Sequence, residues 1–403
     1  MKANYKITPE GTKDYLFEET GAINEVTGIT TSVYRSKGYH EVKTPFLEFF
    51  DEFNMNTGAI AQEQMFKLTD SKGRLMVLRP DSTLPLARVA ATRLQNKRLP
   101  IRLFYSQTVY RSNPSLTGRR NEINQTGIEL LGAGGKRADL EVIVTAVEAL
   151  QKIVKDFRIE LGHAGLFNSL EKKLSCSEEI KEQIRDSIQS KNYSQLGMIL
   201  DSLEPSDTVE AIRKLPRLFG GEEVLNQAAP LFEGTEGEED LKYLSEIYHT
   251  LSKLMMGDKL IMDLGLVQGI DYYSGIIFSA YVEGSGDAVL TGGRYDTLLS
   301  EFDSPMPAAG FAVNADALAD IILDTGKIYD EKPADIIVHA DDGYEMEAIN
   351  QCRFYSLSGF KCENSVFTSR EEAVRYAREN GIRQICLMND SPETIDIEAW
   401  ENE

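Results

Sequence analysis

The spacing of apolar positions in the first third of the chain predicts a set of antiparallel strands. Two long apolar runs, residues 101–112 and 122–132, flank the turn-rich sequence NPSLTGRRN, an arrangement typical of a strand pair. A shorter hairpin is predicted over residues 66–81, where two apolar runs surround a turn that contains glycine. Residues 42–50 have the pattern of an extended segment, and Pro45 restricts that segment to an edge or a bent strand.

Helical spacing predicts the elements around these strands. Apolar positions three and four residues apart indicate helices over residues 20–38 and 137–156, and a helix that begins near Ser82. Residues 166–260 are almost entirely helical in pattern and are rich in acidic side chains.

The last part of the chain has a different pattern. Strand signals return at 260–283 and 308–314, and the polar linker GKIYDEKPAD follows them. Beyond the linker, short strands and helices alternate in the order βαβαβ, which predicts a small, mostly parallel α/β domain over residues 332–403. The preceding residues, 1–325, are predicted to form one α+β domain that carries the helical stretch 166–260 as an insertion.

The composition narrows the class of protein. The 403 residues are 42% hydrophobic, which is sufficient for more than one folded core. Acidic residues outnumber basic ones by 64 to 43, and the net charge of −21 opposes bulk attraction to nucleic acid. The N-terminus has no apolar signal segment, and no apolar stretch is long enough to cross a membrane. The four cysteines lack metal-ligand spacing, so we expect a cytoplasmic protein without a metal site or a cofactor.

Polar residues on an apolar strand give the first indication of a binding site. In EINQTGIELLG, Gln125, Gly127 and Glu129 share one face because side chains alternate along a strand. Polar side chains facing a core are costly unless they meet a polar ligand or each other. The pattern therefore fits either a small polar ligand lying over the strand, with Gly127 leaving room for it, or a hairpin whose polar groups satisfy one another.

The sequence LRPDSTLPLAR offers a second candidate with two interpretations. Asp81, Ser82 and Thr83 precede a predicted helix, and residues of these types commonly cap helix N-termini. A carboxylate at this position is equally suited to hold the ammonium group of an amino acid.

Two further stretches contain side chains that suit a small-molecule pocket. In LVQGIDYYSGIIF, Asp271 offers an acceptor, and Tyr272 and Tyr273 offer hydroxyls next to aromatic rings, although a tyrosine pair also serves packing. In LTGGRYDTLLSEF, the glycine pair permits close approach of the backbone, while Arg294 and Asp296 are spaced for a structural ion pair.

Taken in order, these segments resemble the catalytic core of histidyl-tRNA synthetases, which have the class II aminoacyl-tRNA synthetase fold. GYHEVKTPFLE resembles the first class motif, YRSNPSLTGRRNEINQTGIEL the second, and PAAGFAVNADAL occupies the place of the third. LVQGIDYYSGIIF and GGRYDTLL resemble two histidine-specific signatures. The resemblance covers residues 1–325 and implies an antiparallel sheet flanked by helices, whereas residues 332–403 resemble a reduced anticodon-binding domain.

The chain departs from the synthetase pattern at positions that hold and activate ATP. The resemblance places charged side chains of the synthetases where this sequence has Asn113, Asn121, Gln268 and Ala317. An amide brings neither the charge nor the bidentate fork of an arginine. The positions that the family uses to bind histidine are kept: Asp81, Thr83, Arg111, Gln125, Glu129, Tyr272 and Tyr273. This asymmetry favours a site that binds histidine without activating it, and no catalytic residue is predicted.

This combination of kept histidine-binding positions and replaced ATP-binding positions resembles that of a paralogous family, the regulatory subunits of short-form ATP phosphoribosyltransferases. That resemblance implies a non-catalytic chain that binds L-histidine as a feedback effector and serves a separate catalytic subunit in the first step of histidine biosynthesis. It also implies a homodimer within a hetero-oligomer. Residues 332–403 contain 15 acidic and 7 basic residues, a net charge of −8 that makes a poor platform for tRNA.

Two other functions stay open at this level. An active but divergent histidyl-tRNA synthetase needs replacement cations, for which Arg119, Arg120 and Arg294 are the candidates. A stand-alone module that binds an amino acid or RNA is the third hypothesis, and the acidic charge of the chain argues against its RNA-binding form.

Overall fold

The computed structural model describes residues 6–53, 60–114, 118–256, 258–267, 272–326 and 332–400. The chain forms two compact units, Met1–Tyr329 and Asp330–Glu403. None of the helices in the described ranges is both long and apolar enough to span a membrane.

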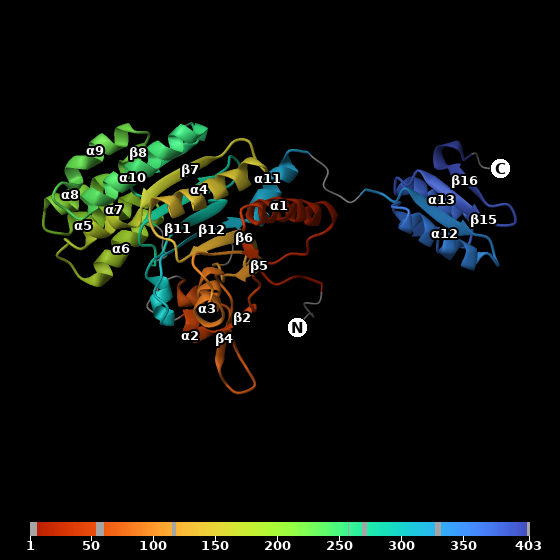
Figure 1. Cartoon of the computed structure of the whole chain (residues 1–403), viewed down its shortest axis with the longest axis horizontal. Helices are drawn as coiled ribbons and strands as arrows, with labels where there is room; N and C mark the ends of the chain where they lie inside the picture. Colours follow the sequence, from red (N-terminus) through yellow and green to blue (C-terminus); the bar gives the residue numbers. More distant parts are fainter. Residues whose placement is uncertain are drawn as a thin grey trace. The chain divides into compact units, whose positions relative to one another are not determined.

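A sheet of nine strands organises the described part of the first unit (Figure 1). Its order is β1 (His40–Glu41), β5 (Ile101–Tyr110), β6 (Glu122–Leu131), β12 (Ala308–Asn314), β11 (Leu290–Arg294), β10 (Ile276–Tyr281), β7 (Arg158–His163), β9 (Leu260–Asp263) and β8 (Phe219–Gly220). From β5 to β7 every neighbouring pair is antiparallel, while β1 and β9 join in parallel. The predicted class, an antiparallel sheet flanked by helices, is confirmed.

Three helices cover one face of this sheet: α1 (Phe17–Ser36), α4 (Lys136–Gln151) and α11 (Ala315–Asp324) (Figure 1). The main core lies between them and the strands. In that core the Tyr34 ring packs against Phe104 and Phe311, with ring centroids 5.9 and 5.7 Å apart. The large buried rings make this face a rigid support, and the opposite face of the same strands is left for the polar residues described below.

A small sheet follows the first helix and carries residues of the candidate site. It contains β2 (Leu47–Phe49), β4 (Leu75–Leu78) and β3 (Lys67–Thr69), and it is flanked by α2 (Phe50–Phe53) and α3 (Thr83–Arg93). The predicted hairpin over 66–81 and the helix start near Ser82 are therefore confirmed. Of the predicted extended segment 42–50, only β2 is a strand. β1 ends at Glu41, ahead of Pro45, and β1 and β2 lie at the edges of different sheets.

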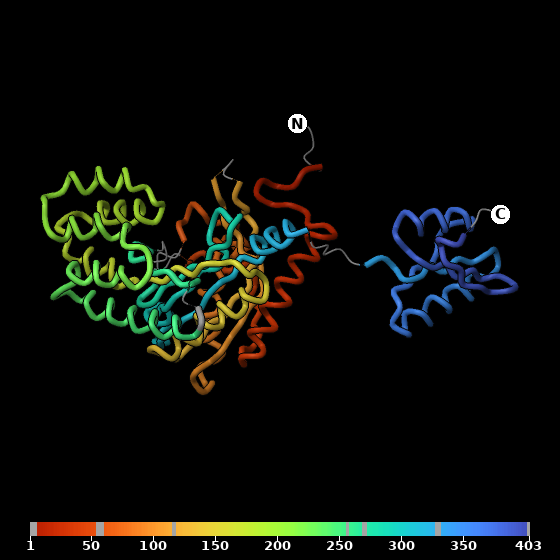
Figure 2. Tube along the Cα trace, turned by 90° about the horizontal axis from the view of Figure 1, so that it is seen from above, coloured from red at the N-terminus to blue at the C-terminus, as the bar shows by residue number. Residues whose placement is uncertain are grey.

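The predicted helical insertion is confirmed and forms a layer of helices beside the sheet (Figure 2). Its members are α5 (Ala164–Glu171), α6 (Glu178–Gln189), α7 (Tyr193–Asp201), α8 (Asp207–Lys214), α9 (Glu223–Phe232) and α10 (Gly237–Leu251). Two inner strands of the large sheet, β7 and β11, were not predicted, nor was its short edge strand β8. β11 contains two glycines and has low intrinsic strand propensity, and β7 follows directly on a helix that ends at Gln151, earlier than the predicted 156. Both strands are paired on each side, so the sheet imposes their conformation.

The second unit has the predicted alternation of strands and helices. Its elements are β13 (Ile336–Ala340), α12 (Glu345–Leu357), β14 (Cys362–Asn364), α13 (Arg370–Glu379), β15 (Gln384–Met388) and β16 (Glu393–Asp396). The sheet order is β14-β13-β15-β16, parallel except for β16. Separate apolar clusters underlie the two helices, which places α12 and α13 on opposite faces of this sheet.

Candidate functional site

Glycines form the floor of the candidate site on the sheet face opposite α1 and α4. The register places Glu129 of β6 beside Gly310 of β12, and Gly310 beside Gly293 of β11. A Cβ at Gly310 would lie 1.9 Å from Glu129 Oε2, and a Cβ at Gly293 would lie 2.6 Å from Tyr273 Cε1. The two glycines therefore allow the Glu129 carboxyl and the Tyr273 ring to lie flat against the strands.

Gly127 has a different role from the predicted one. A Cβ at this position would lie 2.5 Å from the Tyr105 hydroxyl oxygen and 2.2 Å from the Phe311 carbonyl oxygen. The space above Gly127 is thus taken by the side chain of its partner on β5 and not left for a ligand. This correction adds Tyr105, which is 1% exposed, to the buried groups around the site.

Glu129 is the central polar group of the site. Its side chain is only 1% exposed, and it accepts a hydrogen bond from Thr83 Oγ1 at 2.7 Å and another from the Tyr295 hydroxyl. Burial and, to a smaller extent, the nearby Asp81 carboxylate raise the pKa of Glu129 to about 8, against the hydrogen bonds from Tyr295 and Thr83, which lower it. Among the residues that the structure describes, no cation forms an ion pair with Glu129, so a cationic ligand has an unmatched carboxyl to meet.

Asp81 serves the helix and also faces the site. Its Oδ1 accepts a hydrogen bond from the Leu84 backbone N–H at 3.0 Å, so the predicted capping role is confirmed. Burial raises the pKa of Asp81, whereas hydrogen bonds and the Arg111 guanidinium oppose that rise. The Asp81 charge acts on the hydroxyls of Tyr272 and Tyr273, as does the Glu129 charge. Two carboxyls therefore face one small volume.

Tyrosine rings form the wall of this volume. The Tyr272 ring centroid lies 5.2 Å from that of Tyr273 and 5.5 Å from that of Tyr295. Burial raises the pKa of all three hydroxyls, and Glu129 raises it further, so they stay protonated as hydrogen-bond donors. Tyr295 was not among the predicted site residues. Its position directly after the glycine pair and Arg294 was the available signal.

Arg111 and Gln125 lie at the other end of the site, where a cleft of about 620 Å³ opens. Both residues line the cleft, together with Ala317 of α11. Arg111 Nε donates a hydrogen bond to the Pro80 carbonyl at 2.9 Å, which fixes the guanidinium beside the strand that leads to Asp81. The structure thus brings the seven predicted histidine-binding positions to one face of the sheet.

Three of the four positions at which synthetase charges are replaced lie within the described residues. The Asn113 backbone N–H donates to Asn121 Oδ1 at 2.9 Å, and Asn121 Nδ2 donates to the Glu10 carbonyl at 2.9 Å. These amides bind each other and the N-terminal segment. Ala317 is half-buried in the first turn of α11 and presents a methyl group to the cleft. Gln268 lies outside the described residues.

The arginines proposed as substitutes are engaged in ion pairs with aspartates: Arg119 with Asp287 at 3.3 Å, Arg120 with Asp320 at 2.8 Å, and Arg294 with Asp139 at 2.6 Å and with Asp296 at 2.9 Å. The predicted Arg294–Asp296 pair is confirmed. Since Arg294 is 6% exposed and held by two carboxylates, it is a structural cation and not one available to a nucleotide.

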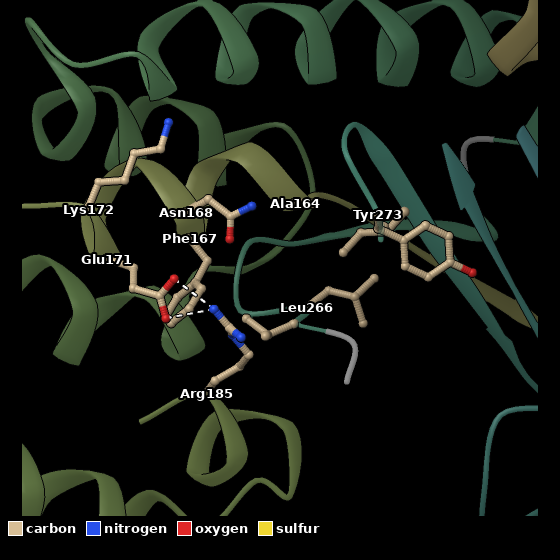
Figure 3. Close-up of a pocket in the computed structure, with 10 residues that line it drawn as sticks. Ala164, Phe167, Asn168, Glu171, Lys172, Arg185, Leu266 and Tyr273 are labelled. Atoms are coloured by element: carbon tan, nitrogen blue, oxygen red, sulfur yellow. Dashed lines mark hydrogen bonds and ion pairs between the residues drawn. The ribbon is translucent and has the colours of Figure 1, made fainter. Parts of the chain in front are cut away.

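A smaller pocket of about 260 Å³ adjoins the site on the side of the helical insertion (Figure 3). The Glu171 carboxylate of α5 accepts two hydrogen bonds from Arg185 of α6, at 2.9 and 2.8 Å, on one side of this pocket. Tyr273 forms the other side, and Figure 3 shows its hydroxyl directed away from the Glu171–Arg185 pair. Tyr273 is thus a shared boundary between the insertion and the site.

Comparisons with known proteins show which family has this fold and these motifs. The family model described as histidyl-tRNA synthetase matches residues 11–318. An ATP phosphoribosyltransferase regulatory subunit of Bacillus cereus (strain AH187) is 39% identical over 98% of this chain and 94% of its own length. The chain belongs to the family of ATP phosphoribosyltransferase regulatory subunits. Its resemblance to that family and to the synthetases, predicted from the motifs, is therefore confirmed.

Solved structures agree with this assignment. A structure described as an ATP phosphoribosyltransferase regulatory subunit/histidyl-tRNA synthetase from Bacillus halodurans C matches with a TM-score of 0.83 and 28% identity, covering 96% of this chain and 100% of the other. The histidyl-tRNA synthetase of Nostoc sp. PCC 7120 matches with a TM-score of 0.75 and 19% identity, over 99% and 96% of the two chains. The second match shows the shared fold alone.

Proposed function

We propose that this chain is the non-catalytic, histidine-binding regulatory subunit of a short-form ATP phosphoribosyltransferase, whose catalytic subunit carries out the first step of histidine biosynthesis. One observation supports the proposal above the others. The buried half of the site retains Glu129, its hydrogen-bond donors and the tyrosine wall. In the half that corresponds to ATP activation, Asn113 and Asn121 bind each other.

The geometry suggests how histidine lies in the site. The imidazole ring packs on Tyr273 and donates an N–H to Glu129, because that carboxyl is the buried acceptor between the aromatic side chains. The ammonium group is held by Asp81, and the carboxylate by Arg111 and Gln125 at the cleft end. In this arrangement each polar group of the ligand has, on the sheet face, a hydrogen-bond partner or a side chain of opposite charge.

Feedback follows from a difference in affinity. Histidine inhibits the catalytic subunit only if it binds the inhibited state of the complex more tightly than the active one. A coupling free energy of about 1–3 kcal/mol corresponds to roughly 5–150-fold control. A homodimer of this chain within a hetero-oligomer is part of the proposal.

The direct test is the affinity for L-histidine measured by calorimetry. Glu129→Ala and Tyr273→Phe are each expected to weaken binding by about 1–3 kcal/mol, because the first removes the acceptor of the imidazole N–H and the second removes a buried hydroxyl donor that faces the ligand. Glu239→Ala and Tyr193→Phe are matched controls on exposed helical positions and are expected to bind like the wild type. Unchanged affinity in both pocket variants, with folded protein by circular dichroism, would show that histidine binds elsewhere.

The raised pKa of Glu129 gives a second test. In the free partners, Glu129 titrates at about 8 and the histidine imidazole at roughly 6.5, whereas the complex holds one proton between them. Below the lower pKa the complex must release a proton, and above the higher pKa it must take one up, so affinity is greatest between the two values. Calorimetry in buffers of different ionisation enthalpy, from pH 5.5 to 8.5, measures the loss of affinity on the acid side and on the alkaline side.

Glu129→Gln is the control for this pH dependence. The amide cannot titrate, so the loss of affinity on the alkaline side of pH 8 is expected to vanish in the variant while the acid limb stays. An affinity that keeps rising through pH 8.5 in the wild type would refute a proton shared with Glu129.

A further inference from the structure

Tyr105 of β5 carries a buried hydroxyl on the floor of the site. The residue is 1% exposed, and its side chain crosses Gly127, so that the hydroxyl oxygen lies 2.5 Å from where a Cβ on that glycine would be. Within the described residues, this hydroxyl forms no hydrogen bond. A buried hydroxyl without a partner costs free energy, and such groups are rare in folded proteins. The Tyr105 hydroxyl therefore points to a ligand group above β6.

The Tyr105 hydroxyl and the Glu129 carboxyl are separated by a gap that suits a small ring. Glu129 pairs with Gly310 of β12, and Gly127 precedes Glu129 by two residues, so Gly127 and Gly310 are diagonal neighbours. Diagonal neighbours in a sheet are roughly 7–8 Å apart, and their Cβ positions are somewhat closer. The hydroxyl lies near the first Cβ position, and Glu129 Oε2 lies 1.9 Å from the second. An imidazole ring with a hydrogen bond of about 2.9 Å on each side fills this distance.

The Tyr105 hydroxyl is placed to meet a ligand that enters from the cleft. Ala312, the direct partner of Gly127 on β12, lines the cleft of about 620 Å³. Burial raises the pKa of Tyr105 well above its usual value, and the charges of Glu129 and Asp81 add to this effect. The hydroxyl therefore keeps its proton and can both donate and accept a hydrogen bond.

The other hydroxyls of the site are less suited to a second ring nitrogen. Thr83 and Tyr295 already donate to the central carboxyl, and the Tyr272 hydroxyl is hydrogen-bonded to Thr83. In the proposed arrangement the imidazole packs on the Tyr273 ring. A ring stacked in this way meets its neighbour face to face, whereas the hydrogen bonds of its nitrogens lie in its own plane. That leaves Tyr105.

We propose that Tyr105 is a specificity-determining residue of the histidine site, whose hydroxyl forms a hydrogen bond with the imidazole nitrogen that does not bond to Glu129. This inference rests on the proposed function, which places histidine in the site. Both ring nitrogens then have a partner. A side chain of similar shape without nitrogens leaves a buried hydroxyl and a buried carboxyl unpaired, so the site rejects it more strongly than an apolar pocket does.

The test compares L-histidine with thienyl-L-alanine, whose five-membered ring contains no nitrogen, by calorimetry on the full chain. Tyr105→Phe keeps the ring over Gly127 and is expected to bind histidine at least ~5-fold more weakly, as for loss of a buried hydrogen bond. Its affinity for the thienyl analogue is expected to stay within about 2-fold of the wild type, because that ligand makes no such bond. Selectivity for histidine therefore falls, whereas a packing defect weakens both ligands alike.

Tyr34→Phe is the matched control. It also removes the hydroxyl of a fully buried tyrosine, one that is bonded to Thr126 on the α1 side of the same sheet. Both ligands are expected to bind this variant like the wild type.

Ring-¹⁵N-labelled histidine gives a second measurement, which decides the question if the analogue binds too weakly to measure. In the NMR spectrum of the complex, Tyr105→Phe is expected to shift the resonance of one ring nitrogen and to leave that of the nitrogen bonded to Glu129 in place. Unchanged resonances of both nitrogens would overturn the inference.

The outcomes separate this inference from the proposed function. If Tyr105→Phe binds histidine as tightly as the wild type, or loses both ligands equally, the inference is wrong and the proposed function stands. If the wild type neither binds histidine nor makes the catalytic subunit responsive to it, the proposed function itself fails.

Discussion

The purified chain is expected to exchange labelled pyrophosphate into ATP in the presence of histidine at least ~10⁴-fold more slowly than a motif-complete histidyl-tRNA synthetase. Removal of one preorganised group that stabilises transition-state charge costs ~10²–10³ in rate. The resemblance places two such losses at Gln268 and Ala317. The hydrogen bonds of Asn113 and Asn121 to each other and to the N-terminal segment leave neither amide to compensate.

The control for this experiment is a true synthetase assayed under identical conditions, with histidine binding to this chain measured in parallel. The double variant Gln268→Arg/Ala317→Arg is expected to stay far below the synthetase, because the contacts of Asn121 with the N-terminal segment and with Asn113 are unchanged. Exchange by the wild type within about 10-fold of the synthetase would contradict the regulatory assignment. It would mean that Arg119 or Arg120 leaves its aspartate partner when ATP binds.

Replacing Arg294 by alanine is expected to lower the free energy of unfolding of the first unit by about 3–5 kcal/mol. Arg294 and Asp139 are 6% and 3% exposed, and their closest atoms are 2.6 Å apart. The Tyr243 hydroxyl donates to the other oxygen of Asp139 at 2.6 Å. Without the guanidinium, a buried carboxylate is left with a neutral donor alone, and that uncompensated charge is the main cost.

Urea denaturation followed by near-ultraviolet circular dichroism measures this loss. Arg213→Ala is the matched control, since Arg213 pairs with the exposed Asp201 and Glu210 and its removal is expected to cost less than about 1 kcal/mol. The joint replacement Asp139→Leu/Arg294→Met removes both charges and should recover much of the stability. Equal unfolding curves for Arg294→Ala and Arg213→Ala would show that the buried pair is not a structural support.

The fold was predictable where local pattern and tertiary environment agree. The β5–β6 hairpin and α1 have long, regular apolar patterns, and both form within a few residues of the predicted limits. β11 could not be predicted in the same way, because Gly292 and Gly293 remove the side chains from which a pattern is read. Its conformation depends on β10 and β12, and partners so distant in sequence are invisible to a local pattern.

The site residues that could be predicted are those whose type is unusual for their position in the secondary structure. Glu129 is conspicuous because a carboxyl on an apolar strand is costly. Tyr295 is not conspicuous, since an aromatic residue near a strand end has many uses, and its bond to Glu129 joins residues 166 positions apart. Gly127 was misinterpreted for a related reason: a glycine signals close approach, but the sequence does not say that the approaching group is Tyr105.

The bonds of Asn121 have an evolutionary consequence. Its side chain holds the Glu10 carbonyl and the Asn113 backbone, and a Cβ at Gly11, whose φ is +75°, would lie 2.5 Å from Asn121 Cγ. An arginine restored at position 121 would therefore have to displace the N-terminal segment before it could reach a phosphate. That single reversion is expected to disturb the packing of the N-terminal segment and to return no catalysis. Under the proposed function, the change from a synthetase is therefore hard to reverse one substitution at a time, because a path through position 121 leads through a less stable intermediate.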